Sequence, residues 1–233
     1  MSEELQNFYE NFYAKSQYTG AMGTFHDFYH RKLERHHKSN AGNRILEIGA
    51  GFAEHLKFVS ADFQTYVISD LNLDKKNKYL VSNLESEGLL TDNRIEFAKC
   101  DVGSLPFKND EFDRVIVTCV LHHVSNLEVA LQEIRRVTKD KGQISVYLPC
   151  DPGLLYRFVR HFASHAKQAK IMNASMTHVK YIWSLEHINH FPGILSKLRW
   201  IFKEDDLAFR GGLSRLLPFD FSIFKIIEIT VSK

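Results

Sequence analysis

The chain has 233 residues, of which 44% are hydrophobic and 25% are charged. This composition is that of an ordinary globular protein, and it excludes disordered, collagen-like and coiled-coil chains. A single hydrophobic core can grow to about 250 residues, so one domain with additions accounts for the whole length. With 30 basic and 28 acidic side chains, the net charge of +2 is too small to indicate nucleic-acid binding by itself.

The three cysteines, Cys100, Cys119 and Cys150, are odd in number and lack close pairing. They support neither a disulfide framework nor a zinc or redox pair, and reduced thiols are typical of cytosolic proteins. No uncharged apolar run reaches about 18 residues, and the first four residues lack the basic and apolar regions of a signal peptide. We therefore expect a cytoplasmic protein that does not span a membrane.

From residue 44 onward, short β-rich apolar runs alternate with helical patterns. This alternation predicts a doubly wound, mostly parallel sheet with helices on both faces. The five strands predicted in this part of the chain are 44–48, 65–69, 94–99, 113–119 and 143–149.

The clearest helix lies before the last of these strands. Its apolar residues recur at helical spacing, at Leu127, Leu131, Ile134 and Val137. Ser125 and Glu128 predict a capping box at its start, and Gly142 is the predicted stop signal.

Two more strands are predicted near the end of the chain, at 206–210 and 223–231, separated by a Gly211-Gly212 turn and by Pro218. The prediction is therefore a single α/β domain with a seven-stranded sheet, in which an antiparallel terminal pair follows five parallel strands. We divide it into N-terminal capping helices (1–40), a core (41–150), a helical insertion or lid (151–192), and a terminal helix with the antiparallel strands (193–233).

The N-terminal segment is dense in aromatic residues, namely Phe8, Tyr9, Phe12, Tyr13, Tyr18, Phe25, Phe28 and Tyr29. Two interpretations are open and can both hold. The rings either cap a ligand pocket and exclude water, or pack an added helix onto the core.

The segment from Arg44 to His55 runs from a buried strand through a glycine turn into a predicted helix. Gly49 permits a tight turn, and Gly51 lets the backbone approach a ligand without a Cβ atom in the way. This arrangement is typical of a nucleotide site at the carboxyl end of a strand, although a structural turn without a ligand can have the same pattern.

Polar residues also end the next strands. Asp70 lies 23 positions after Glu47, close to the spacing at which a carboxylate reaches the hydroxyls of a bound ribose. A helix N-cap is its alternative role. Asp101 ends the third strand, and Thr118 and Cys119 end the fourth.

These motifs resemble those of the class I S-adenosylmethionine-dependent methyltransferases, in particular the type 11-like small-molecule group. The resemblance lies in the order of Glu-x-Gly-x-Gly (47–51), Asp-x-x-x-Leu-Pro-Phe (101–107), Phe-Asp-x-Val (112–115) and Leu-His-His-Val (121–124). It covers about residues 41–149, a little under half of the chain.

The resemblance implies that S-adenosylmethionine is the cofactor. It implies that Glu47, Gly49 and Gly51 line its methionine end, with Glu47 holding the ammonium group. Asp70 would accept hydrogen bonds from the ribose and Asp101 one from the adenine amino group, while Thr118 and Cys119 would frame the sulfonium. The neighbouring residues predicted to line the same site are Ala50, Leu71 and Val102. One departure is Ala53, which stands where many relatives have a third glycine.

A dinucleotide enzyme is the nearest alternative, and Glu47 argues against it. The pyrophosphate of NAD needs a helix N-terminus without a nearby anion, whereas a carboxylate beside the glycine turn suits a cationic sulfonium amino acid. Methyl transfer is an in-line displacement at an activated carbon, so the protein mainly supplies alignment and, for a hydroxyl acceptor, removal of a proton.

His122 and His123, just after the fourth strand, are the candidate catalytic residues for this proton removal. Packing or lining of the pocket is the alternative role for both. Asp151, at the end of the fifth strand, is a candidate to orient such a histidine.

The stretch 152–185 contains five lysines and arginines and no acidic residue, so its charge is +5. Interleaved apolar residues make it amphipathic, which suits an anionic substrate or an anionic lipid surface. A solvated helix with outward basic residues is the alternative.

The following segment, 186–192, contains His187 and His190, which either line an acceptor pocket or bind a metal. Because no third ligand is near them in sequence, we predict no metal site.

We therefore predict methyl transfer from S-adenosylmethionine to oxygen, nitrogen or carbon of a small or medium-sized acceptor, such as a sugar, a lipid head group or a secondary metabolite, with an anionic acceptor as one option. One alternative is a nucleic-acid methyltransferase that uses the basic stretch. Against it, no Asn/Asp-Pro-Pro-Tyr/Phe motif follows the fourth strand. The other alternative is a binding protein that keeps the fold without turnover.

Overall fold

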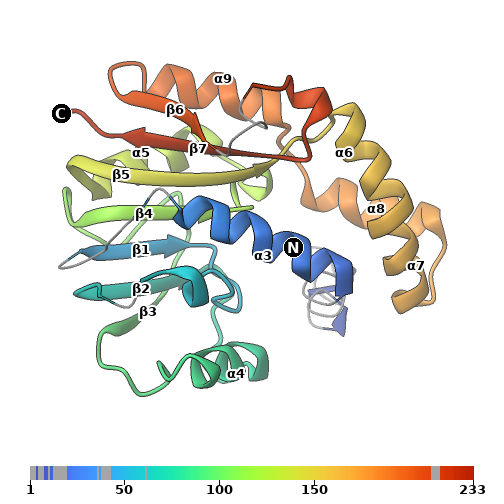
Figure 1. Ribbon diagram of the computed structural model, residues 1–233, viewed down its shortest axis with the longest axis horizontal. Helices are drawn as coiled ribbons and strands as arrows, with labels where there is room; N and C mark the ends of the chain where they lie inside the picture. Colours follow the sequence, from blue (N-terminus) through green and yellow to red (C-terminus); the bar gives the residue numbers. More distant parts are fainter. Residues whose placement is uncertain are drawn as a thin grey trace.

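A computed structural model describes residues 4, 8–9, 11–12, 20–35, 37, 43–60, 62–210 and 216–233. Within these residues, seven strands form one sheet in the order β3-β2-β1-β4-β5-β7-β6 (Figure 1). The strands are β1 (Arg44–Ile48), β2 (Thr65–Asp70), β3 (Ile95–Lys99), β4 (Phe112–Thr118), β5 (Thr138–Pro149), β6 (Asp206–Arg210) and β7 (Phe224–Thr230).

The directions of the strands confirm the predicted fold class. Strands β1 to β5 are parallel, and β7 pairs antiparallel with both β5 and β6. The strand order reverses between β1 and β4, and the carboxyl ends of the strands beside this switch point form the usual ligand crevice of such sheets.

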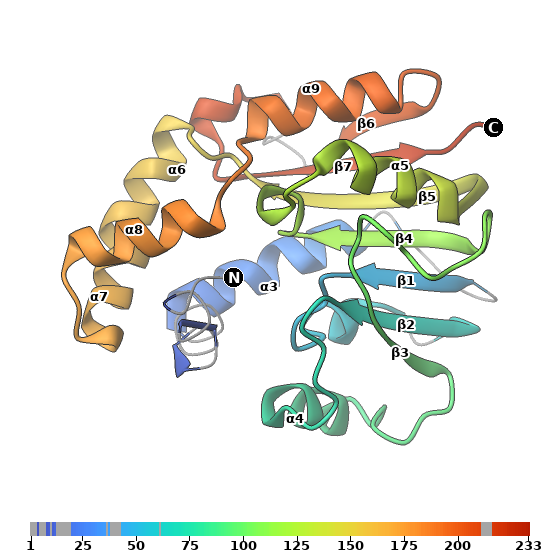
Figure 2. The same ribbon diagram turned by 180° about the vertical axis from the view of Figure 1, so that it is seen from behind.

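Helices cover both faces of the sheet. On one face lie α5 (Leu127–Val137) and α9 (Phe191–Ile201), whose apolar residues join one buried cluster with β4, β5 and β7 (Figure 2). On the other face lie α3 (Gly20–Glu34), α4 (Lys78–Ser86) and the short 3-10 helix η1 (Leu56–Phe58), which share a second buried cluster with β1 and β2. The two clusters make the sheet the centre of a three-layer core.

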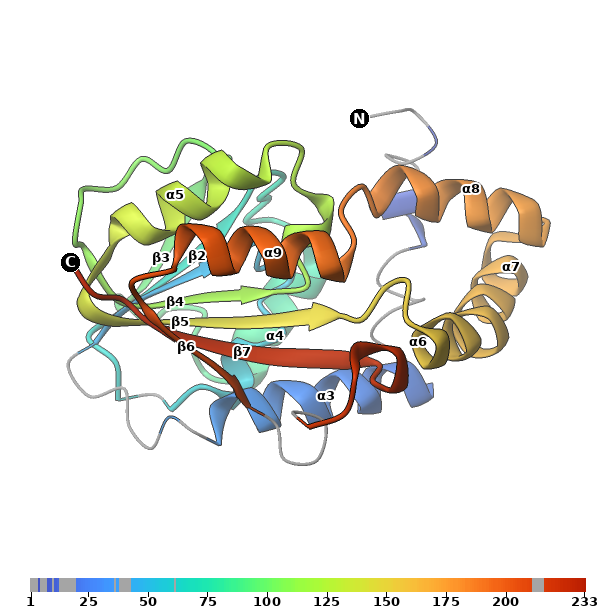
Figure 3. The ribbon, with the colours of Figure 1, turned by 90° about the horizontal axis from the view of Figure 1, so that it is seen from above.

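A helical segment lies beyond the carboxyl ends of the parallel strands, as Figures 1 and 3 show. It comprises α6 (Leu154–Val159), the π-helix η3 (Arg160–His165), α7 (Ala166–Met172) and α8 (Met176–Glu186). Asn173, in the left-handed conformation, separates α7 from α8. Among the described residues no helix has the length and apolarity that crossing a bilayer requires. The division of the chain into four segments stays a prediction.

Two predicted helix signals at α5 are wrong. The cap is Asn126, whose side chain accepts a hydrogen bond from the Val129 amide, rather than Ser125 with Glu128. Gly142 does not stop the helix, because β5 starts directly at Thr138 and contains Gly142. A Cβ atom at Gly142 would lie 2.9 Å from the Lys139 carbonyl oxygen, so close backbone packing explains this glycine.

The helix predicted after the glycine turn is also wrong. Residues 51–55 form turns, and only the three-residue η1 follows. Ala53 has a φ of 57°, a left-handed conformation that interrupts a right-handed helix. The Gly211-Gly212 turn and the aromatic residues Tyr13 and Tyr18 lie outside the described residues.

Candidate cofactor and acceptor site

The turn after β1 has the backbone geometry that its glycines allow. Gly49 and Gly51 adopt φ angles of +64° and +55°. A Cβ atom at Gly49 would lie 2.3 Å from a Val120 methyl group, so this position packs tightly against the loop after β4. A Cβ atom at Gly51 would meet nothing within 4 Å, because this backbone faces open space.

That space is part of a cavity of about 1120 Å³ at the carboxyl ends of the strands. All of the residues predicted to bind the cofactor line it, together with both candidate catalytic histidines. These residues are Glu47, Gly49, Ala50, Gly51, Asp70, Leu71, Asp101, Val102, Thr118, Cys119, His122 and His123. The structure thus brings together residues that are spread over more than 70 positions of the sequence.

Glu47 is the least exposed of the described carboxylates that line the cavity, with 1% of the residue exposed. The hydroxyl of Tyr66 donates a hydrogen bond of 2.7 Å to its Oε2 atom. Burial raises the pKa of Glu47 to about 6, although the nearby His55 and the Tyr66 hydrogen bond oppose the shift. A cation beside this carboxylate would favour its ionised form.

Asp70 and Asp101 each accept hydrogen bonds from nearby backbone amides. Asp70 accepts one from Gly51 at 3.1 Å and one from Asn72 at 2.8 Å, which ties β2 to the glycine turn. Asp101 accepts one from Gly103 at 2.7 Å. Asp70 is not a helix N-cap, because α4 begins at Lys78 and is capped by Asn77.

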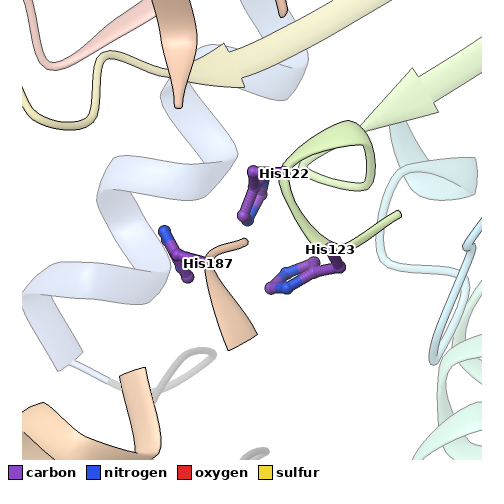
Figure 4. Close-up of side chains that lie close together, drawn as sticks. All are labelled: His122, His123 and His187. Atoms are coloured by element: carbon purple, nitrogen blue, oxygen red, sulfur yellow. The ribbon is translucent and has the colours of Figure 1, made fainter. Parts of the chain in front are cut away.

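Three histidines meet at the other end of the cavity (Figure 4). His122 and His123 belong to the 3-10 helix η2 (Leu121–His123), and His187 follows α8. The ring centroids of His122 and His187 are 4.4 Å apart, and those of His122 and His123 are 3.9 Å apart. Burial lowers the pKa of all three rings, that of His123 to about 4, so all three are neutral at pH 7.

Asp151 contacts a different histidine from those predicted. Its Oδ2 atom lies 3.2 Å from Nδ1 of His187 and 3.0 Å from the guanidinium of Arg160, whereas no hydrogen bond joins it to His122 or His123 in the described structure. Burial raises the pKa of Asp151, but the hydrogen bond from His187 and the charge of Arg160 outweigh burial, so the pKa falls below its usual value.

The basic residues of 152–185 do not share one environment. Arg157, Lys170 and Lys180 are exposed, which fits the solvated-helix interpretation. Arg160, by contrast, lines the cavity and lies 5.0 Å from the centre of the Trp183 ring. It is the first residue of the π-helix, a helix type that often occurs at functional sites.

Comparisons with known proteins agree with this geometry. Residues 46–146 match the family model described as a methyltransferase domain. The chain is 29% identical, over 74% of its length, to the uncharacterized methyltransferase YcgJ of Bacillus subtilis, of which the match covers 66%. It is 32% identical, over 45% of its length, to a ubiquinone/menaquinone biosynthesis C-methyltransferase, UbiE of Coxiella burnetii, of which the match covers 42%.

Among solved structures, a putative methyltransferase from Bacillus halodurans is similar in fold, with a TM-score of 0.59 and 13% identity. The match covers 88% of this chain and 99% of that one. Residues 46–146 therefore form a methyltransferase domain, of the class I S-adenosylmethionine-dependent type. The chain spans less than two thirds of the length of the curated relatives named above. Members of this family generally use S-adenosylmethionine.

The sequence did not indicate a second buried network, which surrounds Arg114. Glu34 of α3 accepts two hydrogen bonds from Arg114 of β4, at 2.7 and 2.9 Å, and lies 2.8 Å from Nε2 of His55. Nδ1 of His55 is 2.7 Å from Nδ1 of His30. His30 and His55 line the cavity. The only sequence signal was the charged Arg114 directly before the apolar run 115–117 of a predicted buried strand.

Proposed function

We propose that this protein transfers a methyl group from S-adenosylmethionine to a small or medium-sized acceptor bound in the same cavity. One observation carries the proposal. A glycine turn and three carboxylates, Glu47, Asp70 and Asp101, line a single cavity at the switch point of the sheet. The remaining cavity volume extends to the histidines and to the helical segment, which leaves space for an acceptor.

The residues present fit the cofactor. Gly51 leaves open the space that a Cβ atom would fill, which suits the amino-acid end of S-adenosylmethionine beside the backbone. Glu47 is buried, and its pKa of about 6 leaves it partly neutral near that pH. An approaching ammonium group would place a positive charge beside this carboxylate. Asp70 holds its carboxylate against the glycine turn, in place for ribose hydroxyls. Leu71, 58% exposed beside it, offers an apolar surface to a base.

S-adenosylmethionine, when bound, supplies a methyl group on a positively charged sulfur atom. The task of this chain is then to align the acceptor and to exclude competing nucleophiles. Cys119 illustrates the second task. Burial raises the pKa of its thiol well above the usual value, so this side chain stays protonated and does not compete for the methyl group as a thiolate.

The acceptor end of the cavity combines aromatic walls with one cation. The Arg160 guanidinium lies 5.4 Å from the ring centre of Tyr156 and 5.0 Å from that of Trp183. A planar or anionic acceptor group suits this environment. An anion bound there would contact Arg160, which also forms an ion pair with Asp151. Proton removal by His122 or His123 stays a prediction.

Calorimetric titration tests the proposal. We expect binding of S-adenosylmethionine and of its demethylated product, S-adenosylhomocysteine, and no binding of NAD. The variant Asp70→Ala should bind about 10- to 100-fold more weakly, because hydrogen bonds to a charged group are lost. Asp206→Ala, an exposed aspartate at the start of β6, is the matched control. Binding of NAD, or an unchanged affinity of Asp70→Ala, would contradict the proposal. Tight cofactor binding without methylation of any acceptor in a cell extract would favour the binding-protein alternative.

We further propose that helix α6 and the π-helix contact an anionic lipid surface. Leu154, Phe158 and Phe162 are 62 to 64% exposed and recur every four residues. Arg157 is exposed on the same helix, and the whole stretch 152–185 carries five basic and no acidic side chains. An exposed apolar row combined with basic charge is typical of helices that lie on anionic membranes.

Vesicle sedimentation tests this contact. We expect the protein to bind vesicles that contain phosphatidylglycerol and not vesicles of phosphatidylcholine alone. The double variant Leu154→Ser/Phe158→Ser should lose this binding, whereas Trp200→Ser, at a 73% exposed position on α9, should keep it. Salt-sensitive binding of RNA without vesicle binding would contradict the proposal and favour the nucleic-acid alternative.

A further inference from the structure

The three histidines at the acceptor end form a set of metal-ligand type. His122, His123 and His187 each offer one ring nitrogen, and these three atoms lie within 4.8 Å of one another. Figure 4 shows the rings gathered where the loop after β4 meets the chain that follows α8. His187 follows the His122–His123 pair by more than 60 residues, so spacing along the sequence does not group the three side chains.

Hydrogen bonds fix two of these rings in the tautomer that a metal requires. Nδ1 of His123 lies 2.8 Å from the carbonyl oxygen of Glu186, so this nitrogen is the donor and Nε2 carries a lone pair. Nδ1 of His187 faces the Asp151 carboxylate, which leaves its Nε2 with a lone pair as well. Metal-bound histidines in proteins show this same pattern, with the second ring nitrogen bonded to a carboxylate or a backbone carbonyl.

His122 supplies the third nitrogen. Its residue is 4% exposed, and its Nδ1 atom makes no hydrogen bond to any described residue. An unpaired nitrogen in a buried ring is unfavourable, and a cation among the three rings would satisfy it.

We propose that His122, His123 and His187 bind a divalent zinc-type metal ion and leave its fourth coordination position open to the cavity. Three protein ligands with one open position are typical of catalytic zinc sites. At a metal–nitrogen distance of 2.0–2.1 Å, two ligands of a tetrahedral site lie about 3.3 Å apart. Separations of up to 4.8 Å would therefore shorten by up to about 1.5 Å on binding.

The open position would take an oxygen atom of the acceptor, and this part of the inference rests on the proposed function. A metal ion held there would lower the pKa of a hydroxyl bound to it, so that the hydroxyl proton would pass to water. The oxygen would then attack the methyl carbon of S-adenosylmethionine, the sulfur–methyl bond would break, and S-adenosylhomocysteine would leave. This role of the metal ion is an alternative to proton removal by His122 or His123, because a ring nitrogen that binds a metal cannot also accept a proton. The acceptor class is then a compound with a hydroxyl group.

Metal binding is measured on the full chain without an affinity tag and after treatment with a chelator. Titration with Co²⁺, followed by the visible absorption of the four-coordinate ion, should give one site, and Zn²⁺ should displace the Co²⁺. The variants His123→Gln and His187→Gln should each bind at least about 100-fold more weakly. Asp151→Asn, which removes the charge beside His187, should cost about 10- to 100-fold.

The matched control is His178→Gln, an exposed histidine on α8, which should leave the affinity unchanged. Circular dichroism establishes that each variant is folded. Absence of a Co²⁺ spectrum, or equal affinity in His123→Gln and the wild type, would overturn the inference. Asp70→Ala should bind S-adenosylmethionine about 10- to 100-fold more weakly and keep its affinity for Co²⁺, so failure of the metal site is distinguishable from failure of the proposed function.

Discussion

Two buried groups of histidines border the cavity, and they differ in how well their polar atoms are satisfied. Both ring nitrogens of His55 are hydrogen-bonded, one to His30 and one to Glu34, and Glu34 in turn holds the buried Arg114. On the other side, Nδ1 of His122 has no partner among the described residues. Both groups are buried, so burial alone does not distinguish a structural network from a binding site. The distinction lies in whether the polar atoms have partners within the protein.

The largest effect is expected from Glu34→Gln, which removes one partner of the buried ion pair. Arg114, 1% exposed, would keep its charge without a counterion, so the free energy of unfolding should fall by about 3–5 kcal/mol. Urea denaturation measures this loss. Glu96→Gln, which breaks an exposed pair with Arg44, is the control and should cost less than about 1 kcal/mol. Similar losses in both variants would contradict a structural role for the Glu34 network.

The same network should make the protein sensitive to acid. Burial raises the pKa of Glu34, but hydrogen bonds from His55 and Arg114 outweigh burial and bring the pKa to about 2, below its usual 4.5. A lowered pKa stabilises the fold above the unfolded-state value, so about 3 kcal/mol is present above pH 4.5 and is lost as the pH falls toward 2. The free energies of unfolding of the wild type and of Glu34→Gln should approach each other as the pH falls from 4.5 toward 2. A constant difference between them across this range would be evidence against the lowered pKa.

Glu47→Gln should separate stability from cofactor binding. A pKa raised from 4.5 to about 6 means that the ionised carboxylate destabilises the fold, and the favourable contribution present below pH 4.5 is lost as the pH rises through 6. The variant should therefore be more stable than the wild type by about 2 kcal/mol above pH 6, with no gain below pH 4.5. It should also bind S-adenosylmethionine at least about 10-fold more weakly. A less stable variant with unchanged cofactor affinity would contradict both expectations.

The smallest effect is expected at His122, and it bears directly on the difference between the two groups. His122→Gln should change the free energy of unfolding by less than about 1 kcal/mol, because Nδ1 of His122 loses no hydrogen bond. His55→Gln should cost about 1.5–3 kcal/mol, since the ring nitrogens of His55 contact His30 and the Glu34 carboxylate. Denaturation of both variants at pH 7 makes the comparison, and a larger loss in His122→Gln would reverse it.

The sequence predicted the strands and the cofactor end of the cavity well because both depend on local patterns. A buried strand followed by a glycine turn can be recognised from about ten consecutive residues. Parallel strands necessarily bring their carboxyl ends to one edge of the sheet. The ten residues predicted to bind the cofactor, of which Glu47 is the first and Cys119 the last in the chain, therefore line one cavity, as the order of motifs indicated. Their contact with a bound cofactor stays a prediction.

The acceptor end was less predictable, because its contacts join segments whose relative placement no local pattern fixes. Asp151 bonds to His187, 36 positions later, and to Arg160 on the π-helix. The ion pair of Glu34 with Arg114 spans 80 positions. The net charge of 152–185 also does not distinguish Arg160, which lines the cavity, from Arg157, which is exposed.

A crystal structure of the protein with S-adenosylhomocysteine tests the central claim most directly. The account predicts that the ribose hydroxyls lie within hydrogen-bond distance of the Asp70 carboxylate. The amino group of the ligand should lie beside Glu47, and the rest of its amino-acid end should lie next to Gly51. A ligand that lies elsewhere, with the space in front of Gly51 empty, would contradict the account.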